Sequence, residues 1–111
     1  CEHCKEPYRP ARTDVPPDFP WDDIGDGEIY RNKGCRECRN VGYSGRMGIY
    51  ELLVANDEIR QLALERTSSW QIRKKAVESG MRTLRMDAWD KVTAGDTSVD
   101  EVLRVTKGEA L

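Results

Sequence analysis

Two C-x-x-C pairs, separated by thirty residues, constrain this chain more than any other feature of its sequence. The first knuckle holds Cys1 and Cys4, and the second holds Cys35 and Cys38. Each knuckle is a tight turn in which both sulfurs point to one side and backbone N–H groups can donate to thiolates. Two facing turns place four thiolates in a tetrahedron, the geometry of a closed structural zinc site. We therefore expect these four cysteines to bind one structural zinc ion per chain.

The free-energy balance favours such a metal. Closing a loop of thirty residues costs about 3 kcal/mol, whereas structural zinc binding contributes on the order of 10–16 kcal/mol in small peptides. The chain has 111 residues, of which 34% are charged and 38% hydrophobic, so its core must be small. A small core gains much from a metal that holds distant segments together.

Other interpretations of the cysteines stay open at this point. Two disulfide bonds would suit a secreted chain, although nothing in the sequence indicates secretion. A redox C-x-x-C would normally stand alone near a βαβ pattern. Iron could occupy the same four-sulfur cage, and the sequence does not exclude it. His3 lies inside the first knuckle beside two better ligands, and we expect it to face solvent.

Charge and motifs predict a module with no active site of its own. The net charge of −2 indicates no general attraction to nucleic acids or acidic membranes, and no apolar run approaches membrane-spanning length. There is no G-x-x-x-x-G-K-[ST] loop to hold phosphates. The single histidine lies in a knuckle, which leaves no partner for a nucleophile.

The segment between the knuckles, residues 5–34, contains all five prolines and many aspartates, and is predicted to be an irregular loop. We expect Phe19 and Trp21 to pack this loop against the rest of the chain. Glu28 to Arg31 predict a short strand that leads into the second knuckle.

The run after the second knuckle is glycine-rich. Gly42, Gly45 and Gly48 exclude a helix, and Ile49 to Leu53 predict a strand because they combine aromatic and β-branched residues.

From residue 56 onward the sequence predicts four short helices. Their start signals are Asn56, Ser68 with Gln71, and Ser98 with Glu101. Gly80 and Gly95 are expected to end the second and third helices. The residues expected to face inward are, helix by helix, Ile59, Leu62 and Ala63; Trp70, Ala76 and Val77; Leu84, Ala88 and Val92; and Val99, Val102 and Leu103.

These elements predict an α+β fold in two parts. Residues 1–53 form a small four-cysteine zinc module with short strands, and residues 54–111 form a bundle of about four short helices. Neither part has enough apolar surface alone, so we expect the two to pack together. The tail, residues 107–111, is expected to fray.

Two long runs resemble a known family. Residues 34–53, G-C-R-E-C-R-N-V-G-Y-S-G-R-M-G-I-Y-E-L-L, and most of residues 76–106, which include G-M-R-T-L-R, are similar to the segment that follows the nucleotide core in secretion ATPases. These are the hexameric motors of type II secretion and type IV pilus assembly. The chain starts at a cysteine, and we expect it to be a piece of such a longer protein.

The resemblance implies a role for this segment. The positions that match the family's four-cysteine motif are Cys1, Cys4, Cys35 and Cys38. The family's phosphate-binding loop, acidic boxes and histidine box lie upstream, so the parent would hydrolyse ATP while this segment would bind none. The implied partners are the rest of the ATPase, neighbouring subunits of its hexamer and an inner-membrane platform protein. The implied location is cytoplasmic, peripheral to the bacterial inner membrane.

The resemblance also bears on the arginines. The arginines that contact ATP in the family lie outside this segment, so none is assigned to Arg46, Arg82 or Arg85. We expect Arg46 instead to hold the glycine-rich run against a carboxylate or carbonyl near Glu51.

Two competing functions are compatible with a four-cysteine module. A zinc ribbon could bind nucleic acid by stacking bases on Trp21, Tyr30 and Tyr43, although the negative net charge argues against it. A chaperone-type zinc module would have C-x-x-C-x-G-x-G repeats, which the second knuckle echoes only loosely.

Overall fold

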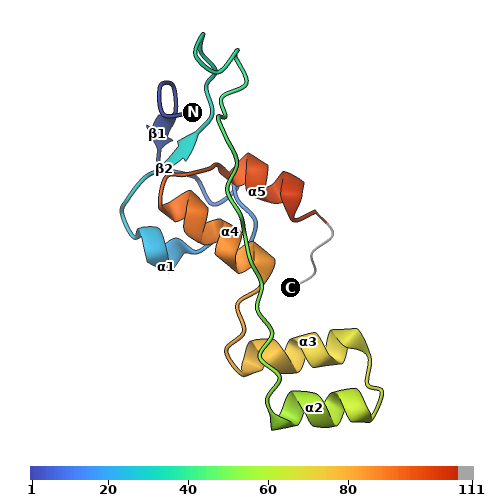
Figure 1. Ribbon diagram of the computed structural model, residues 1–111. Helices are drawn as coiled ribbons and strands as arrows, with labels where there is room; N and C mark the ends of the chain where they lie inside the picture. The colour runs from blue at the N-terminus through green and yellow to red at the C-terminus, as the bar shows by residue number, and fades with distance from the viewer. Residues whose placement is uncertain (108–111) are drawn as a thin grey trace.

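The computed structural model describes residues 1–107, which form an elongated body with principal extents of 55 × 28 × 19 Å (Figure 1). The described residues contain two strands and five helices, which confirms the predicted α+β class. In chain order the elements are β1 Glu6–Tyr8, α1 Trp21–Ile24, β2 Ile29–Arg31, α2 Asp57–Leu64, α3 Ser69–Glu78, α4 Leu84–Thr93 and α5 Val99–Val105.

The two strands pair antiparallel directly beside the knuckles. Pro7 of β1 lies opposite Tyr30 of β2. The predicted strand around residues 28–31 is therefore confirmed, whereas β1 lies in a segment that the sequence predicts as loop. A three-residue strand containing proline carries almost no alternation signal, so only its partner reveals it.

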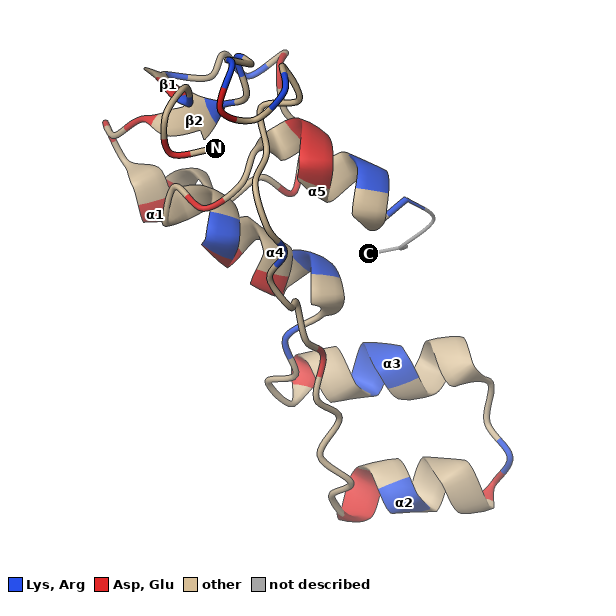
Figure 2. Cartoon of the chain, turned by 45° about the horizontal axis from the view of Figure 1, so that its top comes forward, with Lys and Arg blue, Asp and Glu red and all other residues tan. Residues whose placement is uncertain are grey.

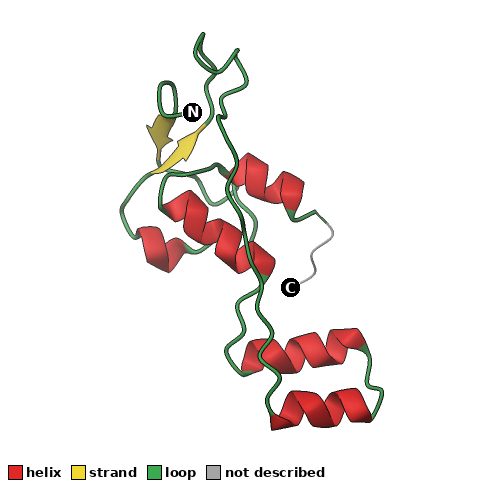
Figure 3. Ribbon diagram, viewed as in Figure 1, coloured by secondary structure: helices red, strands yellow, loops and turns green. Residues whose placement is uncertain are grey.

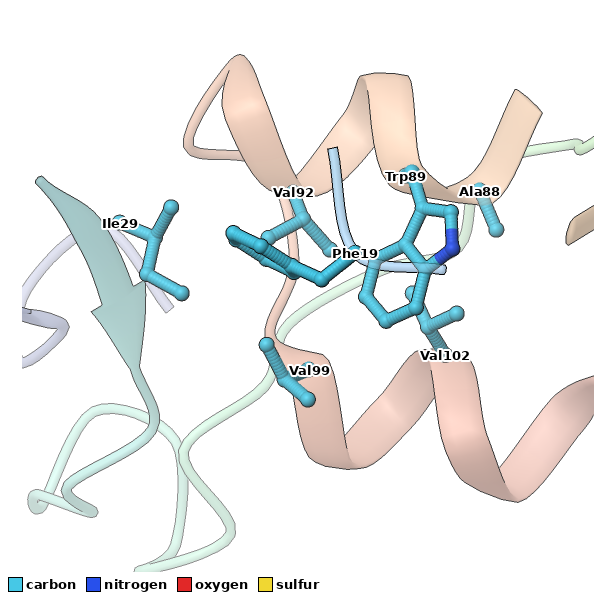
Figure 4. Packing of buried hydrophobic residues seen from close by; sticks show 7 residues of the cluster. All are labelled: Phe19, Ile29, Ala88, Trp89, Val92, Val99 and Val102. Carbon is cyan, nitrogen blue, oxygen red and sulfur yellow. The ribbon is translucent and has the colours of Figure 1, made fainter. Parts of the chain in front are cut away.

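The principal core joins the segment between the knuckles to the last two helices, which confirms that the two predicted parts pack together. Phe19 lies against Trp89, with ring centroids 5.4 Å apart in an edge-to-face arrangement, and the Trp21 ring centroid lies 5.0 Å from that of Phe19. The buried cluster, drawn in Figure 4, consists of Phe19, Ile29, Ala88, Trp89, Val92, Val99 and Val102. This core crosses the predicted boundary at residue 53.

A polar network secures the same contact. Asp18 Oδ2 accepts a hydrogen bond from Trp89 Nε1 at 2.9 Å and forms an ion pair with Arg85 Nε at 2.7 Å. Because both Asp18 and Arg85 are largely covered, this pair is screened less than an exposed one. The loop before α1 is thus attached to α4 by both apolar and charged contacts.

Helix starts follow the sequence signals closely. The predicted caps accept a hydrogen bond from the backbone three residues ahead, and they are Asn56, Ser68 and Ser98. Gly80 and Gly95 adopt φ values of 105° and 84° just after α3 and α4. These left-handed positions favour glycine, which lacks the Cβ that would clash there.

The α2–α3 pair lies apart from α4 and α5, at the far end of the molecule (Figure 1). Ile59 of α2 and Ala76 of α3 are buried, and the two helices contact each other. The prediction that Trp70 faces inward is wrong, because its side chain is 61% exposed and lies under the Lys74 ammonium group. Two short helices cover only a narrow stripe of each other, and Trp70 lies outside it. Leu103, predicted on the inner face of α5, is also exposed.

The prediction of a strand at Ile49 to Leu53 is wrong. The run is extended but has no assigned strand, and Figure 3 shows it as a loop between the two helical pairs. A strand needs a neighbour to hydrogen-bond, and no other described segment pairs with this one.

The predicted fraying of the tail falls almost entirely on residues 108–111, which lie outside the described residues. Among the residues that are described, no helix has the length and apolar character needed to cross a membrane.

Because Trp89 is buried in the core and Trp70 is exposed, replacing each of them should change the stability of the chain by different amounts. Trp89→Ala should lower the free energy of unfolding by about 3–5 kcal/mol, because it removes a buried ring and the Asp18 hydrogen bond. Trp70→Ala, the matched control, should change it by less than about 0.5 kcal/mol. Urea denaturation followed by circular dichroism measures both. Equal losses for the two variants would contradict the packing described here.

Candidate metal centre

The fold brings the four predicted ligands together. The sulfurs of Cys1, Cys4, Cys35 and Cys38 all lie within 4.8 Å of one another. The Sγ–Sγ distances are 3.9 Å for Cys1 to Cys35, 3.8 Å for Cys4 to Cys38 and 3.6 Å for Cys35 to Cys38. All four are free thiols rather than disulfides, and a disulfide would need sulfurs only about 2.05 Å apart.

These distances fit a four-coordinate metal. Four sulfurs at about 2.3 Å from a central zinc lie about 3.8 Å from one another when the site is tetrahedral. Three of the six sulfur separations, between 3.6 and 3.9 Å, surround that value, and none of the six exceeds 4.8 Å. The donor set is therefore suitable in both chemistry and geometry for zinc or another thiophilic metal.

Backbone N–H groups point at the sulfurs, as the knuckle geometry predicts. Gly42 N–H donates to Cys38 Sγ at 3.1 Å, and the Cys35 N–H donates to the same sulfur at 3.3 Å. Gly34 N–H donates to Cys4 Sγ at 3.3 Å. Such hydrogen bonds favour the thiolate, which is the form that binds metal.

The electrostatics of the cluster differ between its sulfurs. Burial raises the pKa of Cys38, but the N–H donors of Cys35 and Gly42 outweigh it and lower this pKa to about 6. For Cys35, the Cys38 N–H lowers the pKa, but burial and the neighbouring thiols of Cys38 and Cys4 raise it above its ordinary value. Four sulfurs this close cannot all carry a negative charge without a cation between them.

Contacts outside the cluster attach it to the core. Lys5 Nζ donates to the Gly95 carbonyl at 3.0 Å and lies 4.4 Å from the centre of the Tyr30 ring. The Tyr43 hydroxyl forms a short hydrogen bond with the Ser98 hydroxyl at the start of α5. Sequence reasoning missed these contacts, because the partners are 90 and 55 residues apart.

Of the two further predictions about residues near the cysteines, the one for His3 is confirmed and the one for Arg46 is wrong. His3 is exposed and outside the sulfur cluster, as expected. The expected pairing of Arg46 near Glu51 is wrong, because Glu51 Oε1 lies 3.1 Å from Arg73 Nη1 and accepts from the Leu84 N–H at 3.2 Å. Arg46 itself is exposed.

The sequence also matches known proteins. Residues 1–104 match the model of the family described as type II/IV secretion system protein. The chain belongs to this family. The four sulfurs therefore form the candidate metal centre of a type II/IV secretion system protein, in a segment that holds one small core and a separate helical pair.

Relatives within the type II/IV secretion family come from both kinds of machine. The chain is 38% identical to type IV pilus assembly ATPase PilB of Pseudomonas aeruginosa, over 96% of this chain and 19% of that protein. It is 40% identical to type II secretion system protein E of the same organism, over 98% of this chain and 21% of that protein. It is 37% identical to type II secretion system ATPase E of Vibrio cholerae, over 96% of this chain and 21% of that protein. This chain thus spans about a fifth of the length of these relatives.

Replacing two glycines that follow the second knuckle, Gly42 and Gly45, by alanine should lower stability by different amounts. A Cβ at Gly42, where φ is +89°, would lie 2.4 Å from Asn32 Cβ, whereas a Cβ at Gly45, where φ is +73°, would meet nothing within 4 Å. Both substitutions strain the backbone, so Gly42→Ala should cost about 1–3 kcal/mol more than Gly45→Ala. Guanidinium denaturation of the two variants checks this. Equal losses would show that the Gly42 contact does not hold the knuckle.

Proposed function

We propose that Cys1, Cys4, Cys35 and Cys38 bind one structural zinc ion, and that this segment is the zinc-stapled scaffold of a secretion or pilus-assembly ATPase. The observation that carries the proposal is the spacing of the four sulfurs, which matches a tetrahedral thiolate site. We favour zinc over iron because the proposed role is structural, and zinc has no redox chemistry to add to it.

The proposed role is mechanical rather than catalytic. Two of the relatives named above are ATPases by name, and most of their length lies outside this segment. We place ATP binding and hydrolysis in that remaining part, with none in these residues. Because the knuckles are attached to α4 and α5 through Lys5, Tyr43 and the Phe19–Trp89 contact, they would move with this core as one body.

The proposed partners follow from the family. The module would contact the rest of the ATPase, neighbouring subunits of a hexamer and an inner-membrane platform protein, passing ATP-driven motion to that platform. The location would be cytoplasmic, at the inner membrane. The proposal covers both secretion and pilus assembly, since relatives of both kinds match at similar identity. The division into residues 1–53 and 54–111 stays a prediction.

The alternative of a nucleic-acid-binding zinc ribbon is less well supported. The aromatic residues that would stack bases make contacts within the chain: Trp21 with Phe19 and Arg12, and Tyr30 with Lys5. Acidic and basic residues are interspersed along the helices (Figure 2). A strong nucleic-acid binder would instead present a basic stripe.

Metal content tests the proposed site. Native mass spectrometry should find one zinc per chain, and a chelator should remove it with loss of helical circular dichroism, because the thirty-residue loop would no longer be closed. Cys38→Ala should lose the zinc, whereas His3→Ala, the matched control in the first knuckle, should keep it. A metal-free chain lighter by four protons would mean two disulfides and would refute the proposal.

The coupling role is tested in the full-length ATPase. Cys38→Ala should leave nucleotide binding in place but abolish secretion or pilus assembly, while His3→Ala should leave both unchanged. If Cys38→Ala instead lost nucleotide binding, and export fell in proportion to that loss, the result would contradict a purely mechanical role.

A further inference from the structure

The charges of this chain are unevenly divided between two neighbouring stretches. Residues 12–28 contain six Asp or Glu residues and one Arg, whereas residues 31–46 contain five Lys or Arg residues and one Glu. Strand β2 lies at the junction of the two stretches. The whole chain has a net charge of only −2, so an acidic and a basic stretch lie side by side in a nearly neutral chain.

The basic surface lies on the second knuckle and the loop that follows it, and it consists of Arg36, Arg39 and Arg46. All three side chains are exposed, and within residues 1–107 none of them has a hydrogen bond, an ion pair or a ring contact. The other two cations of the stretch, Arg31 and Lys33, already contact neighbouring side chains. Figure 2 shows blue stretches in the loops beyond β2. Three guanidinium groups are thus left without a partner in the described part of the chain.

The backbone of the knuckle holds Arg39 in an uncommon conformation. Its φ is 57° and that of Asn40 is 63°, both in the left-handed region, which asparagine adopts far more readily than arginine does. The Asn40 N–H donates to the Cys35 carbonyl at 2.8 Å, and the Val41 N–H donates to the Cys38 carbonyl at 3.1 Å, so the turn is fixed. A charged side chain on a fixed backbone loses less freedom when it binds. Contact with a partner therefore gives a reason for arginine at this position that the fold itself does not supply.

The acidic surface lies on α1 and the turn that leads from it to β2, and it consists of Asp22, Asp23, Asp26 and Glu28. All four side chains are exposed. Asp26 is approached by Arg9 at 3.8 Å, and the other three have no partner within residues 1–107. The ring contacts at the start of α1 attach this surface to the principal core.

We propose that the basic surface of one subunit docks on the acidic surface of the next subunit in the assembled ATPase. No ion pair joins the two surfaces within residues 1–107, so their opposite charges are available to a second copy. A contact between two different surfaces of the same chain repeats head to tail, and such a contact can close a ring. The inference rests on the proposed function in taking this protein as a subunit of a hexamer, and it adds which surfaces meet.

A nucleic acid is a poorer occupant of the basic surface. The apolar residues beside the arginines are Val41 and Met47, whose side chains are 57% and 50% exposed. Arginine and methionine are both enriched in protein interfaces. The single aromatic residue of residues 31–46, Tyr43, is half-buried and bonded through its hydroxyl to Ser98, so this stretch offers no exposed ring on which a base could stack.

A charge swap in the full-length ATPase tests the contact. One variant carries Arg39→Glu with Arg46→Glu, and the other carries Asp23→Lys with Asp26→Lys. Either variant alone would bring like charges together, so the concentration at which half of the subunits are in rings should rise at least about tenfold. An equimolar mixture should return this concentration to near the wild-type value, because a ring in which the two variants alternate brings Glu against Lys and Arg against Asp. Analytical ultracentrifugation measures all four samples.

Two controls accompany the swap. Arg66→Glu reverses an exposed cation in the connection between α2 and α3, away from both surfaces, and should leave assembly unchanged. Zinc content, measured on the same samples, should be equal in all variants, which shows that the substitutions beside the knuckle leave the sulfur cluster intact.

Each other outcome has a definite meaning. A mixture that assembles no better than either variant alone would overturn the inference. A defect confined to the arginine variant would assign the basic surface to another partner, such as a nucleic acid, and would overturn it too. Wild-type rings with a failed mixture would leave the proposed function standing, whereas a wild-type protein that forms no ring would refute the proposed hexamer and this inference with it.

Discussion

The thirty residues between the cysteine pairs begin and end at one cluster of four sulfurs, all within 4.8 Å of one another. This closure places β1 beside β2, because each strand lies within a few residues of a knuckle. It also returns the loop so that Phe19 reaches Trp89 on α4. As thiolates the four sulfurs would repel one another, so under the proposed function a zinc ion between them would hold this closure.

The two helical pairs are held in different ways. The α4–α5 pair shares a core with the segment between the knuckles, reinforced by the ion pair of Asp18 with Arg85. The α2–α3 pair has no share in that core and connects to it through the extended run and the segment around Gly80, with Glu51 and Arg73 as a lateral ion pair. The α2–α3 pair is thus attached to the half of the chain that holds the sulfur cluster by fewer contacts than α4 and α5 are.

The sequence predicts local features better than distant ones. The helix caps at Asn56, Ser68 and Ser98 join groups three residues apart, so local residue types are enough to reveal them. The two knuckles can be predicted from the sequence because the C-x-x-C spacing by itself brings the two sulfurs of each pair to one side of a tight turn. By contrast, the bond between Asp18 and Trp89 spans 71 residues, and no local pattern indicates it. The strand predicted near Ile49 failed because no described segment lies beside these residues to form a hydrogen-bonded ladder with them.

Zinc K-edge X-ray absorption of the purified chain reports the atoms around the metal, and it therefore tests whether the four cysteines hold a zinc ion. The expected spectrum shows four sulfur neighbours at about 2.3 Å and no nitrogen or oxygen bound to the metal. A shell containing imidazole nitrogen or water would show that the four cysteines do not close the site, and would contradict the claim that they hold the two ends of the thirty-residue loop together.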